Sequence, residues 1–383
     1  MGTIMDYSDW RGDLSFAKDP FNDIDALILA LLSYLPFKDI VPGVDSNKGI
    51  SLKDTSIQYF AKNQTKEAQS PSINPTASPS LDSELLELLQ KTADSARFKD
   101  IQLSKYDANT DFIVGQQFGA MTFTLPNAKH NKVIAFRGTD NSLIGWKEDF
   151  EIAYMEEIPA QKSACDYLDR TLGLFPNNVT VCGHSKGGNL AVYACSRVNT
   201  TRQNRLSKII NFDGPGFDFD IVPRASFSHC ENKVINYVPE ESIIGMLLEP
   251  IGERTVVAST ARGINQHNAL NWRAQQSKFL LGNLSSTTKL LENTLKTWLA
   301  DLPIPKRKMF TEALFDIFGA SEGRTIDPKE TIKETKTILT KYSKLDLETK
   351  ILLAKVFTSL NTKSTITISK AIRENWHNIL QSS

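Results

Sequence analysis

Short runs of β-branched and apolar residues alternate with helical stretches through the middle of the chain. This alternation is the sequence feature that most restricts the possible fold classes. The runs are FIVGQQF, AMTFTL, KVIAFRG, NVTVCGH, SKIINFDG, KVINYVPE and RTVVAST, with helical segments between them at residues 160–175 and 188–198. This order predicts an α/β fold with a mainly parallel sheet covered by helices and with antiparallel pairing at its start.

The composition of the 383 residues is that of an ordinary globular protein, with 40% apolar and 23% charged residues. Forty-four basic residues balance forty-four acidic ones. No overall field then draws the chain to polyanions, so we expect no nucleic-acid partner. The oligomeric state is left open.

The sequence has the features of neither a secretory signal nor a membrane span, and we expect a cytoplasmic protein. The start of the chain has acids where a secretory signal needs a basic segment. The most apolar run, residues 26–37, is well short of the roughly 20 residues that span a bilayer and predicts a buried helix. Transient contact with a membrane surface stays open. The four cysteines have neither paired nor metal-like spacing, so we expect reduced thiols, no metal and no cofactor: Cys165, Cys182, Cys195 and Cys230.

Changes in composition along the chain divide it into four segments. Residues 1–62 are expected to be a helical N-terminal segment. Residues 63–82, rich in Ser, Pro, Asn and Thr, are expected to be an exposed loop. Residues 83–277 hold the alternating α/β core, and residues 278–383 carry apolar residues at helical spacing.

The segment Gly183-His184-Ser185-Lys186-Gly187 is a G-x-S-x-G motif between a β-branched run and a small-residue helix. In this context the motif predicts a sharp strand-to-helix turn that exposes a nucleophilic serine, Ser185. The backbone N–H of Lys186, at the start of the helix, is then placed to stabilise an oxyanion. The alternative is a glycine-rich turn with a bystander serine.

A serine nucleophile needs a base, and the chain has five histidines: His130, His184, His229, His267 and His377. With the order nucleophile, acid, histidine expected of this turn, His267 is the preferred base, because it lies in a loop-like segment after the last strand. We interpret His184, beside the serine, as pointing elsewhere.

The acid that would orient the histidine is left open by the residues alone. Asp213 ends the run KIINFDG, and Glu240 or Glu241 ends the run KVINYVPE. Both positions lie at the carboxyl edge of a parallel sheet, where the serine is also expected.

Three segments together resemble the class 3 (fungal-type) lipases: FRGTD with the following Trp and Asp, the serine motif, and INFDGPGF. The chain is still more similar to an uncharacterised bacterial family of intracellular lipase-like proteins, through DYSDWRGDLSF, GHSKGGNLA and VPEESIIGMLLE. This resemblance covers roughly residues 5–275. It implies an α/β-hydrolase fold and a hydrolytic site, without naming a substrate.

The resemblance also implies roles for single residues. Thr139 becomes the second oxyanion donor beside Lys186, and Glu241 is selected over Asp213 as the acid of a triad with Ser185 and His267. The expected activity is hydrolysis of a lipid or other acyl ester through an acyl-enzyme. Two alternatives are acyl transfer by the same triad and a catalytically silent scaffold that binds a partner. The helical C-terminal region is expected to form a lid over the site or a support elsewhere.

Overall fold

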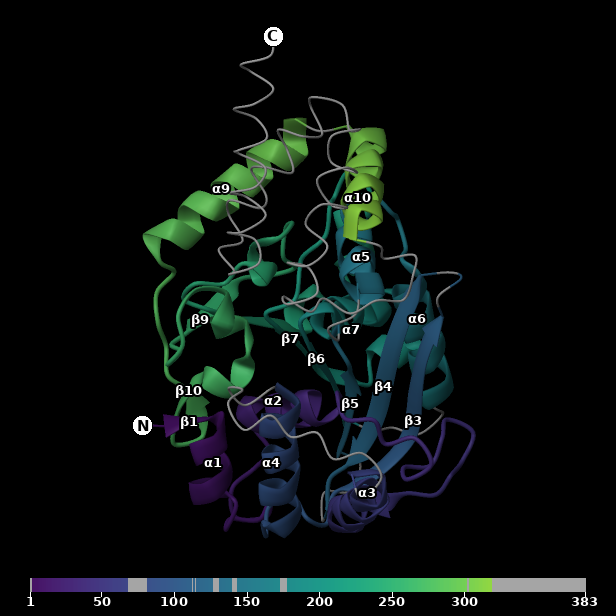
Figure 1. Cartoon of the computed structure of the whole chain (residues 1–383), viewed down its shortest axis with the longest axis vertical. Helices are drawn as coiled ribbons and strands as arrows, with labels where there is room; N and C mark the ends of the chain where they lie inside the picture. The colour runs from purple at the N-terminus through teal and green to yellow at the C-terminus, as the bar shows by residue number, and fades with distance from the viewer. Residues whose placement is uncertain are drawn as a thin grey trace. The chain divides into compact units, whose positions relative to one another are not determined.

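A computed structural model describes the chain at residues 2–67, 81–111, 113, 115–126, 131–139, 143–172, 178–301 and 303–318. Its centre is a sheet of eight strands in the order β2-β3-β4-β5-β6-β7-β8-β9 (Figure 1). The strands are β2 Ile50–Ser51, β3 Gln102–Asp111, β4 Gln116–Thr124, β5 Asn131–Phe136, β6 Asn178–His184, β7 Leu206–Phe212, β8 Val234–Pro239 and β9 Arg254–Val257.

The sheet confirms the predicted mixed α/β class and its mostly parallel pairing. β2 with β3 and β4 with β5 are antiparallel, whereas β5 to β9 run parallel to one another. The carboxyl ends of β6, β7 and β8 therefore meet at one edge of the sheet. That edge carries the residues that follow these strands.

One strand was wrongly located by the sequence pattern. The run FIVGQQF is not one strand: Ile113 and Gly115 lie in a turn, and β4 begins at Gln116. The preceding strand, β3, has the mostly polar sequence QLSKYDANTD and only one buried residue among its ten. Because few of its side chains are apolar, hydrophobic periodicity could not find it.

Two helices cover opposite faces of the parallel strands. In β6 the thiol of Cys182 donates to the carbonyl oxygen of Ala26 in α2 (Asp23–Leu32) at 3.6 Å. Asn211 of β7 instead crowds Gly188 of α7 (Lys186–Arg197). Cys182 pairs with Ile210, the neighbour of Asn211, and successive side chains of a strand point to opposite faces. The sheet therefore lies between α2 and α7.

The apolar run at residues 26–37 is a buried helix and the turn after it, as predicted. Asn22 caps α2, with its side-chain oxygen 2.9 Å from the N–H of Ile24. Residues 24–32 are buried on all sides, which explains why the run shows no polar face. Among the described residues no helix combines the length and the apolar character needed to cross a membrane.

The remaining elements surround this centre. Helix α4 of the N-terminal region packs against both α2 and α1 (Figure 1). A second, three-stranded sheet has the order β1-β10-β11. The bounds are α1 Ile4–Arg11, α3 Leu52–Glu67, α4 Leu81–Asp94, α5 Leu143–Glu151, α6 Pro159–Thr171, α8 Thr200–Gln203, α9 Ser286–Asp301, α10 Ile304–Phe318, β1 Gly2–Thr3, β10 Arg273–Gln275 and β11 Lys278–Phe279.

The described chain divides into two compact units. The first contains residues 1–110, 118–138 and 159–295, and so holds the N-terminal segment together with the parallel strands. The second contains residues 111–117, 139–158 and 296–383. Within it α5 packs against α10, and Arg307 donates to the carbonyl oxygen of Ala153 at 3.0 Å.

The predicted segment boundaries at residues 62, 82 and 277 do not coincide with those of the units. Of the expected loop 63–82, residues 63–67 belong to α3 and residues 81–82 to α4, and residues 68–80 lie outside the described residues. In the C-terminal region α9 and α10 are helices, and residues 319–383 lie outside the described residues. Its role as lid or support stays a prediction.

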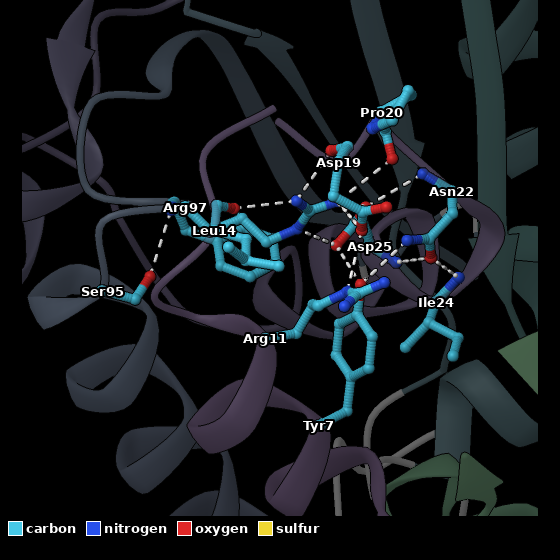
Figure 2. A network of polar contacts seen from close by, with 11 residues as sticks. Tyr7, Arg11, Leu14, Asp19, Pro20, Asn22, Ile24, Asp25, Ser95 and Arg97 are labelled. Carbon is cyan, nitrogen blue, oxygen red and sulfur yellow. Dashed lines mark hydrogen bonds and ion pairs between the residues drawn. The ribbon is translucent and has the colours of Figure 1, made fainter. Parts of the chain in front are cut away.

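A buried polar network joins the N-terminal segment to residue 97 (Figure 2). Arg97, 0% exposed, donates to both carboxylate oxygens of Asp25, at 2.8 and 2.5 Å. It also donates to the carbonyl oxygens of Leu14, Asp19 and Pro20. All five N–H donors of the guanidinium are therefore used, which allows the charge to be buried.

We predict that this network is a main source of stability for the first unit. Asp25→Asn should lower the free energy of unfolding by about 3 kcal/mol or more, because it removes the buried carboxylate that accepts two hydrogen bonds from the Arg97 guanidinium. The measurement is chemical denaturation followed by circular dichroism. Lys208→Gln is the matched control, since it removes an exposed ion pair with Asp23 at the start of the same helix and should cost less than about 1 kcal/mol. Equal losses in the two variants would contradict the prediction.

Candidate functional site

The turn after β6 is shaped by contacts that tolerate no side chain. A Cβ atom on Gly183 would lie 2.1 Å from the backbone of Gly187, and one on Gly187 would lie 2.1 Å from the carbonyl oxygen of Phe136. A Cβ on Gly188 would lie 1.9 Å from Oδ1 of Asn211. The start of α7 can pass this close to β5, β6 and β7 only because these positions are glycines.

Between these glycines, Ser185 has a left-handed backbone conformation with φ 58° and ψ −134°. Such a conformation is strained for a residue with a side chain and persists where the surroundings enforce it. The N–H of Ser185 donates to the carbonyl oxygen of Phe212 at 2.9 Å. Lys186 is the first residue of α7, so its N–H lies at the positive end of the helix dipole. The turn has the geometry predicted for the motif.

Ser185, His267 and Asp213 form a continuous chain of hydrogen bonds. Oγ of Ser185 lies 2.9 Å from Nε2 of His267. Nδ1 of the same ring lies 2.7 Å from Oδ2 of Asp213. The carboxylate is fully buried and the imidazole is 23% exposed. Since a carboxylate only accepts, Nδ1 carries a hydrogen and neutral His267 presents a bare Nε2 to the serine hydroxyl.

Asp213 reaches His267 because the chain turns sharply where β7 ends. Its φ is 52°, so its side chain no longer follows the alternation of side chains from one face of the sheet to the other that holds along β7. Its second oxygen, Oδ1, accepts from the hydroxyl of Ser242 at 2.5 Å and from the N–H of Gly245 at 3.2 Å. The turn that follows is braced by Asn211, whose Oδ1 accepts from the N–H of Gly214 at 2.8 Å.

The contacts of Glu241 differ from those expected of a triad acid, and it is Asp213 that contacts His267. The carboxylate of Glu241 accepts from the N–H of Gly263 at 2.5 Å and from Nε2 of Gln266 at 3.2 Å. The N–H of Glu241 donates back to Oε1 of Gln266 at 2.8 Å. Glu241 follows β8, which is one strand further from Ser185 than β7, and it is used to hold the start of the 3₁₀ helix Gly263–His267. It does not contact the imidazole.

The other residues named by the sequence fall outside this chain of hydrogen bonds. Thr139 belongs to the second unit, where its hydroxyl donates to Asp149 at 2.7 Å. His229 is exposed, in the segment before β8. His130 and His377 lie outside the described residues. Within the described ranges, no cluster of three His, Cys, Asp or Glu side chains could hold a metal ion.

His184 is the residue that sequence reasoning missed. It points toward His267, with ring centroids 4.7 Å apart. Its Nε2 lies 2.8 Å from the carbonyl oxygen of His267, and its Nδ1 lies 2.9 Å from the hydroxyl of Tyr34. Burial, together with the adjacent His267, lowers the pKa of His184 to about 3. No local pattern could reveal this, because residues 34, 184 and 267 are far apart in the sequence.

Comparisons with known proteins identify one family. The sequence model of the Mbeg1-like family matches residues 92–316. No curated protein matches the chain. Among solved structures, a crystal structure of M37 lipase is similar at 15% identity and a TM-score of 0.35, over 58% of this chain and 69% of that chain.

We predict that His184 makes stability depend on pH in a defined window. Its pKa is about 3 in the folded chain and near its ordinary value of 6.5 after unfolding. Between these values only the unfolded chain binds the extra proton. The contribution of His184 is therefore fully present above about pH 6.5 and is lost as pH falls toward 3.

His184→Gln tests this window, because glutamine binds no proton. Its free energy of unfolding should fall less steeply than that of the parent from about pH 6.5 to 4.5, by up to about 1.4 kcal/mol per pH unit. Urea titrations at several pH values provide the measurement. Parallel curves for the two proteins would show that folding does not lower the pKa of His184.

Proposed function

The chain belongs to the Mbeg1-like family, and we propose that it is a lipase-like serine hydrolase of α/β-hydrolase type. It would cleave a carboxylic ester of a lipid or another acyl group. The observation that carries the proposal is the unbroken contact from Asp213 through His267 to Ser185, at 2.7 and 2.9 Å. A serine, a histidine and a buried carboxylate in this order activate the serine for acyl transfer.

Each group has a role that its surroundings support. Ser185 attacks the carbonyl carbon of the ester, and His267 accepts the hydroxyl proton on Nε2. Asp213 orients the imidazole and stabilises its positive charge, while Ser242 and Gly245 donate to its other oxygen and hold the carboxylate in place. His267 then returns the proton to the leaving alcohol. Water attacks the acyl-enzyme by the same route and releases the acid.

The oxyanion would be stabilised by the backbone N–H of Lys186, and the resemblance to class 3 lipases implies a second donor, the N–H of Thr139. Lys186 begins α7, where the helix dipole favours negative charge. Within the first unit, Gly138 leaves space beside the serine, because a Cβ there would lie 3.0 Å from Cβ of Ser185.

We predict that Ser185→Ala abolishes hydrolysis of a short p-nitrophenyl ester, because it removes the nucleophile. The free energy of unfolding should change by no more than about 1 kcal/mol, since only one hydroxyl contact is lost. A fluorophosphonate probe followed by peptide mass spectrometry should label Ser185 in the parent. Ser196→Ala, which alters a serine at the other end of the same helix, is the matched control and should keep full activity. Absence of labelling in folded parent protein would favour the silent-scaffold alternative.

We predict that neutralising Asp213 lowers kcat far more than neutralising Glu241. Asp213→Asn should lower kcat by about 10³-fold or more, because the amide cannot stabilise the imidazolium and favours the wrong tautomer. Glu241→Gln should lower kcat by no more than about tenfold, since glutamine can still accept from the N–H of Gly263. Steady-state kinetics on the same ester measures both. The acid assignment would return to Glu241 if the two losses were reversed.

A further inference from the structure

His184 holds the backbone of His267 through one hydrogen bond whose direction is determined. The partner of its Nε2, at 2.8 Å, is the carbonyl oxygen of His267, which can only accept. Nε2 must therefore carry the hydrogen. With its pKa lowered by burial the ring is neutral, so Nδ1 is bare and needs a donor.

That donor is Tyr34, which comes from the N-terminal segment. Its hydroxyl lies 2.9 Å from Nδ1 of His184 and 3.2 Å from the carbonyl oxygen of the same residue. Gly138 makes room for it, because a Cβ there would lie 2.1 Å from the Tyr34 oxygen. Tyr34 also follows α2, which is anchored by the contact between Asp25 and Arg97. Tyr34 therefore reaches His184 from the end of a helix that is anchored in the core.

Resting on the proposed function, we propose that Tyr34 is a positioning residue for the catalytic histidine. Its hydroxyl fixes His184 as the tautomer with hydrogen on Nε2, and His184 in turn holds the backbone of His267. Residues 1–91 lie outside the range matched by the family model, so the proposal gives this part of the chain a role in the reaction.

Contacts other than that of His184 also hold the histidine loop. Glu241 and Gln266 form a pair of hydrogen bonds, and Asn268 donates to Glu84 of α4 at 2.8 Å. Trp272 donates to the carbonyl oxygen of Gln266 at 2.8 Å. Loss of the Tyr34 hydroxyl should therefore leave the loop folded and loosen only the contact through His184. The expected defect is in kcat rather than in binding or stability.

The test begins with Tyr34→Phe in the full chain. We expect kcat for a p-nitrophenyl ester to fall about tenfold with KM unchanged, which corresponds to one lost hydrogen bond. Tyr237→Phe is the matched control, because it removes a tyrosine hydroxyl that donates to Asp23 of α2 at 2.8 Å and should keep full activity. An unchanged kcat in Tyr34→Phe, or an equal loss in the control, would overturn the proposal.

A double-mutant cycle separates positioning through His184 from a general structural effect. Glutamine at position 184 can still donate to the carbonyl oxygen of His267 but has no tautomers. In the His184→Gln background, Tyr34→Phe should therefore lower kcat by no more than about twofold. The same loss in both backgrounds would show that Tyr34 does not act through His184, and would overturn the proposal.

Nuclear magnetic resonance gives a readout that needs no activity. Long-range ¹H–¹⁵N correlation spectra of the parent should show His184 with hydrogen on Nε2 only, and Tyr34→Phe should shift this pattern toward a mixture. A parent with hydrogen on Nδ1 would overturn the proposal even if His184→Gln failed to fold. Absence of ester hydrolysis and of Ser185 labelling in the parent would instead refute the proposed function, while the spectra still report on the tautomer.

Discussion

The close approach of the turn after β6 to the strands beside it is the constraint on which the site depends. Three glycines, at positions 183, 187 and 188, leave space that a single Cβ atom would fill. The turn then forces Ser185 into a left-handed conformation, a strain that the surrounding sheet and helix maintain. The same constraint places the serine at the carboxyl edge of β6, where the ends of the neighbouring strands are within reach.

The histidine is held in a different way. His267 lies in a short 3₁₀ helix, and side chains from separate elements hold this loop: Asp213 from the end of β7, Glu241 from the end of β8, and His184 from β6. None of these contacts is local in sequence. A loop has little rigidity of its own, so a base positioned within hydrogen-bond reach of a serine needs such support.

The buried pair Asp25 and Arg97 extends this support to the N-terminal segment (Figure 2). Burial of two charges is unfavourable unless both are fully hydrogen-bonded, and here every donor of Arg97 has an acceptor. The network connects the turn before α2 to the residues after α4. It anchors the helix that leads to Tyr34, so a purely structural feature bears on the proposed chemistry.

Hydrophobic periodicity and turn residues report local structure directly, so the sequence alone predicted the α/β class, the mostly parallel sheet and a buried helix within residues 26–37. It also named the serine turn, since a strand, glycines at fixed spacing and a helix are all local signals. It could not find the polar strand β3, show that Asp213 rather than Glu241 contacts His267, or connect Tyr34 and His184 to His267. Those outcomes depend on the left-handed turn at Asp213 and on which side chains meet across the fold. Only tertiary packing decides contacts between residues far apart in the chain.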